Sequence, residues 1–282
     1  MKALRDLPWS LWRQQLRAVV RLEFTKSVFR KRGLWIYLLS LAPLLLMGAH
    51  AVFMSHRPGR CTLSRDTVMF AGMFQLFILR LVVFFGCVGI FMNLFRGEVL
   101  DRSLHYYFLA PVRREILVIG KYVAGLITAI LCFATSTAVS FLVLFSHFGA
   151  ARFQEFLFQE SGLEHLAAYA GVTMLACAGY GAVFLAMGMV FQNPMIPAAI
   201  VWVWEAANPL LPPALKKISV IFYLKSLCPV AVPAKGVMAF LTLATEPTPP
   251  ALAIPGVLAV ALALLVFAAL RSRRMEISYV AE

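Results

Sequence analysis

Long apolar runs recur along this chain of 282 residues, and they restrict its fold more than any other feature. Several are longer than about 18 residues, enough for a helix to cross a hydrocarbon core of about 30 Å. Only 14% of the residues are charged, whereas soluble domains have about one quarter. These properties predict an all-α polytopic membrane protein.

Six spans are predicted within one transmembrane domain that occupies residues 1–282. Their approximate limits are 33–54, 68–95, 117–146, 166–191, 195–211 and 252–270. The segment between the last two spans contains "ISVIFYLKSL" and "GVMAFLTLA", which are apolar but too short to cross, and several prolines interrupt it. These two stretches are predicted to form short re-entrant or interfacial helices on the outer side.

The distribution of Lys and Arg predicts the orientation of the spans. With the N-terminus in the cytoplasm, the segments on that side contain 17 of these residues and the outer loops contain 8. Positive charge gathers on cytoplasmic loops, so both termini are expected in the cytoplasm and the protein in the cytoplasmic (inner) membrane. The membrane also explains the net charge of +13, so nucleic acid is not expected as a partner.

An amphipathic helix is predicted before the first span. A row of apolar residues recurs every four positions and a row of arginines runs beside it; the two rows are Trp12, Leu16, Val20, Phe24 and Val28, and Arg13, Arg17 and Arg21. Such a helix lies in the membrane interface, with its rings in lipid and its arginines among anionic headgroups. The alternative is a helix that packs against a protein partner.

One charged stretch, "DRSLHYYFLAPVRREILVIGKY" at residues 101–122, separates the second and third spans. Residues 97–109 can form a helix with Leu100, Leu104 and Tyr107 on one face, and Pro111 then breaks it and suits the first turn of the next helix. A helix that presents Leu and Tyr among charges suits the docking of another protein. An ordinary cytosolic loop with snorkelling side chains accounts for the same composition.

The longer stretch "FRGEVLDRSLHYYFLAPVRREILVIGKYVAGL" resembles the loop between the second and third spans of type-2 ATP-binding-cassette (ABC) exporter permeases. The likeness rests on an acidic-basic helix, a Ser-Leu pair, a proline before a basic step and a Gly-Lys pair; these residues are Glu98, Asp101, Arg102, Ser103, Leu104, Pro111, Val112, Arg113, Gly120 and Lys121. The family often has Gly-Thr where this chain has Arg102-Ser103. The layout is similar over nearly the whole chain: an elbow helix, six spans and short outer helices before the last span.

The resemblance implies a permease subunit whose inner loop couples to a separate ATPase subunit. The residues expected at that contact are Glu98, Asp101, Arg102, Leu104, Tyr107, Pro111, Arg113 and Arg114. ATP and Mg²⁺ are expected in the partner ATPase and no cofactor or enzymatic activity in this chain, which has no GxxxxGK[ST] phosphate loop. The other expected partners are a second permease copy, in a homodimer or heterodimer, and membrane lipids.

Two charged residues fall inside predicted spans, Arg80 in the second and Glu205 in the fifth. Each lies roughly 15–18 Å deep, near the midplane of the bilayer. An unpaired charge at that depth costs about 2.5–3.5 kcal/mol on insertion scales. Two interpretations stay open: a buried Arg80–Glu205 pair that holds two spans together, or charges on a translocation path.

Two other functions are weighed against an exporter permease. A proton- or ion-coupled secondary transporter could use Arg80 and Glu205 as its relay, although the sequence shows no inverted repeats. An intramembrane enzyme needs converging nucleophiles, acids or metal ligands, and no metal-ligand spacing is present. The sequence does not select a substrate. Cys61 and Cys228 both fall on the predicted outer side, where a disulfide could form in an oxidising compartment.

Overall fold

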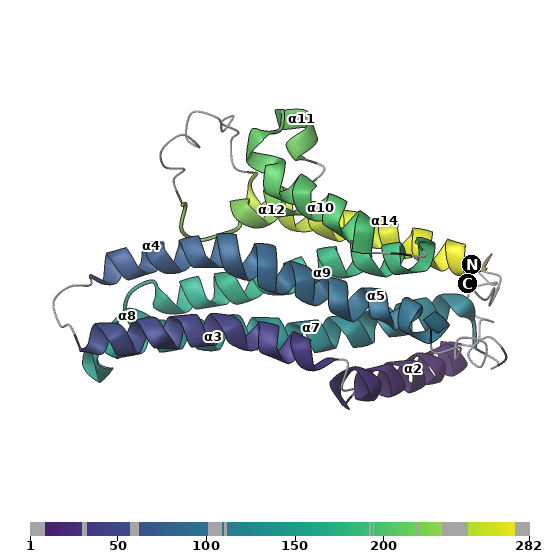
Figure 1. Cartoon of the computed structure of the whole chain (residues 1–282), viewed down its shortest axis with the longest axis horizontal. Coiled ribbons are helices and arrows are strands. Elements are labelled where there is room, and N and C mark those ends of the chain that lie inside the picture. Colours follow the sequence, from purple (N-terminus) through teal and green to yellow (C-terminus); the bar gives the residue numbers. More distant parts are fainter. Residues whose placement is uncertain are drawn as a thin grey trace.

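The computed structural model describes residues 9–29, 33–56, 62–100, 109, 112–191, 193, 195–217, 219–232 and 248–273, and every regular element within them is a helix. Five helical segments are long and apolar enough to cross a membrane. They are α3 (Leu34–Ser55), the continuous α4–η2–α5 (Leu63–Met73, Phe74–Val83 and Phe84–Leu100), α7 (Arg114–Phe145), α9 (Gly162–Val190) and α14 (Pro250–Arg273). They form an elongated bundle (Figure 1). The predicted all-α class, with several helices able to span a membrane, is confirmed.

Shorter helices lie at the ends and on one side of this bundle. They are α2 (Trp9–Phe29), η3 (Ser146–Phe148), α8 (Ala150–Phe158), α10 (Met195–Ala207), η4 (Asn208–Leu210), α11 (Pro213–Lys216) and α12 (Val220–Ser226). Helix α2 marks one end of the bundle and α8 the opposite end, and they are used below to name those ends (Figure 1). Of the two short outer helices predicted, the first contains α12, and "GVMAFLTLA" lies outside the described residues.

The fifth predicted span, 195–211, contains a shorter α-helix than expected. Helix α10 has 13 residues, so it is roughly 20 Å long, less than the roughly 30 Å of a hydrocarbon core. A 3₁₀ turn, η4, follows it. Pro209 lacks an amide hydrogen and disfavours α-helical backbone at the residue before it, which explains why the α-helix ends at Ala207.

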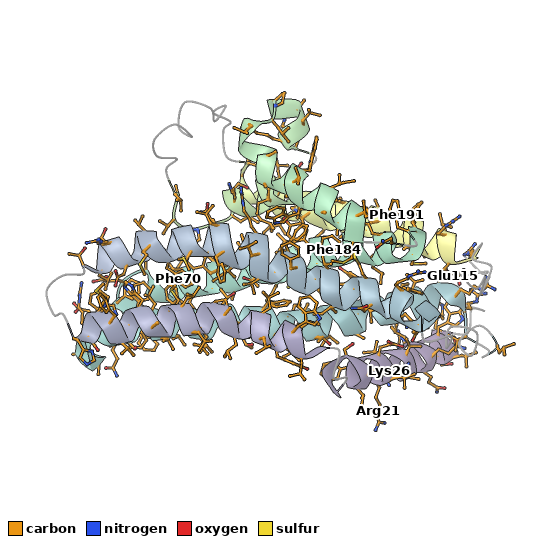
Figure 2. The ribbon with its side chains drawn as sticks, viewed as in Figure 1. Arg21, Lys26, Phe70, Glu115, Phe184 and Phe191 are labelled. Atoms are coloured by element: carbon orange, nitrogen blue, oxygen red, sulfur yellow. The ribbon has the colours of Figure 1, made fainter. Side chains whose placement is uncertain are left out.

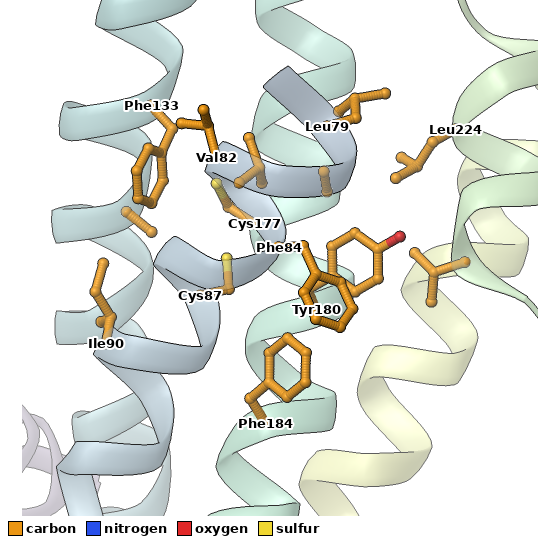
Figure 3. Packing of buried hydrophobic residues seen from close by; sticks show 14 of the residues in the cluster. Leu79, Val82, Phe84, Cys87, Ile90, Phe133, Cys177, Tyr180, Phe184 and Leu224 are labelled. Carbon is orange, nitrogen blue, oxygen red and sulfur yellow. The ribbon is translucent and has the colours of Figure 1, made fainter. Parts of the chain in front are cut away.

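Helices α5 and α9 form the centre of the bundle. In the most apolar part of the α4–η2–α5 segment and of α9, 72% of the residues are buried, against 22% in α3 and α14. The ring of Phe84 packs edge-on against Tyr180 and Phe184, with centroids 5.3 and 5.0 Å apart (Figure 3). A Cβ atom on Gly188 would lie 3.0 Å from the Cα of Met92. Glycine therefore lets the two central backbones approach closely, as small residues do in membrane helix pairs.

The middle of the second span, η2, is a π-helix of ten residues. Buried side chains recur there and in α4 as adjacent pairs every four residues, at Phe70-Ala71, Phe74-Gln75, Ile78-Leu79 and Val82-Val83. In an α-helix of 3.6 residues per turn, such a stripe drifts about 40° at each step. A π-helix has more residues per turn, which opposes this drift, and the stripe stays buried along η2. π-Helical turns are rare and occur often at functional sites.

A group of ionisable side chains links three elements at the α8 end. The Oδ2 atom of Asp66, which is 1% exposed, lies 3.3 Å from Nε2 of His147 and 3.8 Å from Nε2 of His50. The Nδ1 atom of His147 donates to the carbonyl of Leu144 at 2.7 Å. Asp66 therefore connects α3, α4 and η3, and within the described residues this group is not arranged as a metal site.

Cys228, just after α12, carries a free thiol that donates to the carbonyl of Leu224 at 3.5 Å. Its predicted partner, Cys61, lies outside the described residues.

Candidate functional site

Two buried lysine–glutamate contacts meet near the start of α7, at the α2 end of the bundle. The ammonium group of Lys121 lies 2.9 Å from Oε1 of Glu23 on α2 and 2.8 Å from Oε2 of Glu98 on α5. It also donates to the carbonyl of Leu94 at 2.9 Å. Lys26 lies 3.4 Å from the other oxygen of Glu98. We call Glu23, Lys26, Glu98 and Lys121 the Lys121 cluster.

The Lys121 cluster is balanced in charge, and three of its four residues are buried. Lys121 is 0% exposed, Glu23 3% and Glu98 4%, so water screens their interaction weakly. The ammonium group of Lys121 donates hydrogen bonds to Glu23 and to the Leu94 carbonyl, and its charge also pairs with Glu98. Breaking a buried ion pair by removing one partner costs about 3–5 kcal/mol. The cluster therefore fastens α2, α5 and α7 together at both ends of the segment that separates the second span from the third.

Gly120 explains how α2 comes so close to α7. A Cβ atom at this position would lie 2.6 Å from Cγ1 of Val19 and 2.9 Å from its Cβ. No other residue therefore fits without displacing α2, and the displacement would pull Glu23 away from Lys121. In the Gly-Lys pair noted in the sequence, the glycine provides the space and the lysine provides the charge.

A Gly120→Val substitution is expected to destabilise the protein by about 1–3 kcal/mol, the usual cost of overpacking. It should lower the melting temperature of the purified protein, followed by intrinsic fluorescence. The size-exchanged variant Val19→Gly/Gly120→Val should recover part of the loss. Gly171→Val is the matched control, because a Cβ on Gly171 meets no atom within 4 Å. An equal loss in Gly171→Val would show that the contact with Val19 is not responsible.

The first residues of α7 are also tied to α2 and α14. The Arg113 guanidinium lies 4.6 Å from the ring centroid of Trp12. Arg114 donates from one nitrogen to the carbonyls of Ser272 and Arg273, at 3.2 and 3.1 Å, and Glu115 pairs with Arg273. Cations at a helix C-terminus satisfy its free carbonyls and its dipole. Arg114 thus caps α14.

The residues predicted to contact an ATPase therefore divide into two groups. Glu98, Arg113 and Arg114 are described, and all three take part in contacts within the chain at the α2 end. The rest of the predicted set, Asp101, Arg102, Leu104, Tyr107 and Pro111, lie outside the described residues.

Helix α2 exposes its arginines and buries another face. Arg13, Arg17 and Arg21 are exposed, and Arg21 points away from the bundle (Figure 2). Trp12 and Phe24 are partly buried, while Val19 and Glu23 are fully buried. The buried face of α2 packs against α7 of the same chain.

Glu205, near the end of α10, is 5% exposed and accepts hydrogen bonds from four groups. The donors are the hydroxyls of Ser219 (2.8 Å) and Tyr180 (3.2 Å) and the backbone amides of Val220 (3.0 Å) and Ile221 (2.9 Å). The two amides belong to the first turn of α12. Glu205 therefore supplies the carboxylate that this helix N-terminus favours, and it joins α9, α10 and α12.

Arg80 does not form the direct ion pair with Glu205 that the sequence suggested. No ion pair within 4.0 Å joins these two described residues, although their charges are near enough to interact. The Nε atom of Arg80 is buried without an acceptor. Its backbone carbonyl accepts a hydrogen bond from Nε1 of Trp202 at 3.2 Å. The spacing of two charges along a sequence cannot show that a backbone amide lies closer to the glutamate than the arginine does.

Sequence reasoning noted Lys121 only as part of a motif and missed its buried partners. A signal was present, because Glu23 falls on the same face of the predicted helix as Leu16 and Val20, where a carboxylate needs a partner. The contacts of Asp66 with His50 and His147 were also missed, since the three residues are far apart in the sequence.

Comparison with known proteins gives no assignment for this arrangement: no protein-family model matches the chain, and no curated protein matches it.

Proposed function

We propose that the chain is the permease subunit of a type-2 ABC exporter, which moves its substrate with energy from a separate ATPase subunit. The observation that supports this most is the Lys121 cluster. It joins an amphipathic helix and two spans at the base of the charged segment that resembles the coupling loop of that family. A force applied to this segment reaches three helices at once.

In this mechanism, the ATPase subunits close when they bind ATP and Mg²⁺, and they move the predicted helix around residues 98–115. The buried contacts of Lys121 transmit this movement to α2, α5 and α7. The contacts of Arg114 and Glu115 extend it to the end of α14. A second copy of the permease, identical or homologous, completes the assembly.

Helix α2 is proposed to lie in the membrane interface as the elbow helix. Leu11 and Leu22 are 49% and 47% exposed, and they share one flank of α2 because they are about three turns apart. The exposed arginines Arg13, Arg17 and Arg21 occupy another flank. Lipid on one flank and anionic headgroups on the other suit a helix of this kind.

Six passes with both termini in the cytoplasm are proposed from the directions of the helices. Tyr122 contacts Ala178, and Thr137, further along α7, contacts Thr173, so α9 runs antiparallel to α7 towards the α2 end. Helix α14 also ends beside the start of α7. We propose that the chain between α9 and α14 turns back towards the α8 end, and that α10 begins this return.

A secondary transporter that uses Glu205 as its proton relay is less well supported. Four donors hold this carboxylate at the start of α12, which favours a structural role.

The docking proposal is tested by co-purification from mild detergent. Leu104→Asp and Tyr107→Asp are expected to reduce the amount of ATPase recovered with the tagged chain by about tenfold or more, as for central interface residues. Phe158→Asp, at an exposed position on α8, places the same charge at the opposite end and should change nothing. The proposal fails if no ATPase co-purifies with the unmodified protein, or if the two loop variants retain it fully.

A further inference from the structure

A cavity of about 230 Å³ lies between η2, α9 and α10. Its lining includes Leu76, Arg80, Phe84, Tyr180, Trp202 and Glu205. Leu76 is 59% exposed, so it stands at the mouth of the cavity, on the outer surface of the bundle. Arg80 is the eighteenth residue of a segment that runs from Leu63 to Leu100, so the cavity lies near the middle of the second span.

The two charged groups that line the cavity differ in how many of their polar atoms already have hydrogen-bond partners. The carboxylate of Glu205 already accepts four hydrogen bonds from Tyr180, Ser219, Val220 and Ile221. Arg80 has an unpaired Nε and no ion pair among the described residues, although a guanidinium offers five N–H donors. The hydrogen-bonding capacity that is still unpaired among the charged groups of the cavity therefore belongs to Arg80.

The remaining walls are apolar. Phe84, Tyr180 and Trp202 contribute aromatic faces, and the indole N–H of Trp202 is already used by the Arg80 carbonyl. This hydrogen bond fixes the backbone of the π-helix at the residue that carries the charge. An arginine held in an apolar setting binds carboxylate and phosphate groups bidentately, and the bound anion offsets the cost of burying the charge.

We propose that this cavity binds the anionic head of a single-chain amphiphile, a carboxylate or phosphate on a hydrocarbon chain, with Arg80 as its anchor. The volume is below the range of about 300–1,000 Å³ for pockets that enclose a whole drug-sized ligand. It therefore accommodates the head and the adjacent part of the chain, and the rest leaves past Leu76. That such a molecule is also the exported substrate rests on the proposed permease function, but its binding does not.

The test is a fluorescence titration of the protein in phosphatidylcholine nanodiscs, with empty nanodiscs subtracted. The probes are a dansyl-labelled undecanoic acid and its methyl ester, which has no charge and one additional methyl group. The acid is expected to bind at least about tenfold more tightly than the ester. Arg80→Gln should remove this preference by weakening the acid alone, and Arg80→Lys should retain part of it.

Arg65→Gln is the matched control, since it removes the same charge from an exposed position on the same continuous helix. It should leave both titrations unchanged. Ala206→Phe adds a ring to the cavity wall while Arg80 is kept, and it should weaken both probes, which keeps the test decisive if Arg80→Gln does not fold. Unlabelled dodecyl phosphate then separates the two headgroups: strong displacement of the acid assigns a phosphate, and weak displacement assigns a carboxylate.

Equal affinity of the unmodified protein for acid and ester would overturn the proposal, as would acid binding that survives both Arg80→Gln and Ala206→Phe. The permease function fails separately. If Arg80-dependent binding is found but no ATPase co-purifies, the site stands and the exporter does not.

Discussion

Replacement of Lys121 by methionine is expected to destabilise the protein by about 3–5 kcal/mol, because Glu23 and Glu98 would stay buried without their main counter-charge. The loss should appear as a lower melting temperature and a lower yield of monodisperse protein. If the proposed permease function holds, transport should be lost as well, since α2 would no longer be fastened to α5 and α7.

Two comparisons separate the charge from the packing of this side chain. The variant Glu23→Gln/Glu98→Gln/Lys121→Met carries no buried charge at these three positions, so it should be more stable than Lys121→Met alone. Lys26→Met should have a smaller effect, because the Lys26 side chain is 35% exposed and exposed pairs contribute only about 0–1 kcal/mol. If the triple variant is no more stable than the single one, the Lys121 cluster is not held by its charges.

Replacement of Glu205 by alanine is expected to cost about 2–4 kcal/mol, because several buried donors would lose their acceptor. The damage should concentrate at α12, whose first two amides bind this carboxylate. Cys228 lies just beyond α12 and reports on it. In a variant with Cys228 as its sole cysteine, Glu205→Ala should accelerate maleimide labelling of this thiol.

Tyr180→Phe is the control, since it removes one of the four donors and leaves the carboxylate in place. It should change the labelling rate of Cys228 little. Unchanged labelling in Glu205→Ala would mean that α12 does not depend on the carboxylate.

The long helices were predictable because their cause is local. Apolar runs set the positions of α3, α7, α9 and α14 within a few residues. The short α10 was less predictable, since the mainly apolar stretch continues to Leu211, while Pro209 ends the α-helix after Ala207. The π-helical conformation of η2 was not predicted, because the apolar residues of this stretch suit an α-helix equally well. The four-residue spacing of its buried pairs is visible only once the burial of each residue is known.

The sequence identified the important charged residues but not the groups that they contact. Arg80 and Glu205 were identified as intramembrane charges, but the acceptor role of Glu205 depends on where α12 begins in space. Lys121 was identified by its motif. Its two carboxylate partners, Glu23 and Glu98, are both more than 20 residues away in the chain, so the motif does not include them.

The π-helical conformation of η2 has a consequence for α4, the part of the same segment that lies towards α8. The buried pairs of η2 begin at Phe74, Ile78 and Val82, and in an α-helix their two steps would add up to roughly 80° of drift. Asp66, which precedes η2, would then be turned by about this angle relative to α5. The π-helix thus sets the angle about the helix axis at which the side chains of α4 point, relative to those of α5.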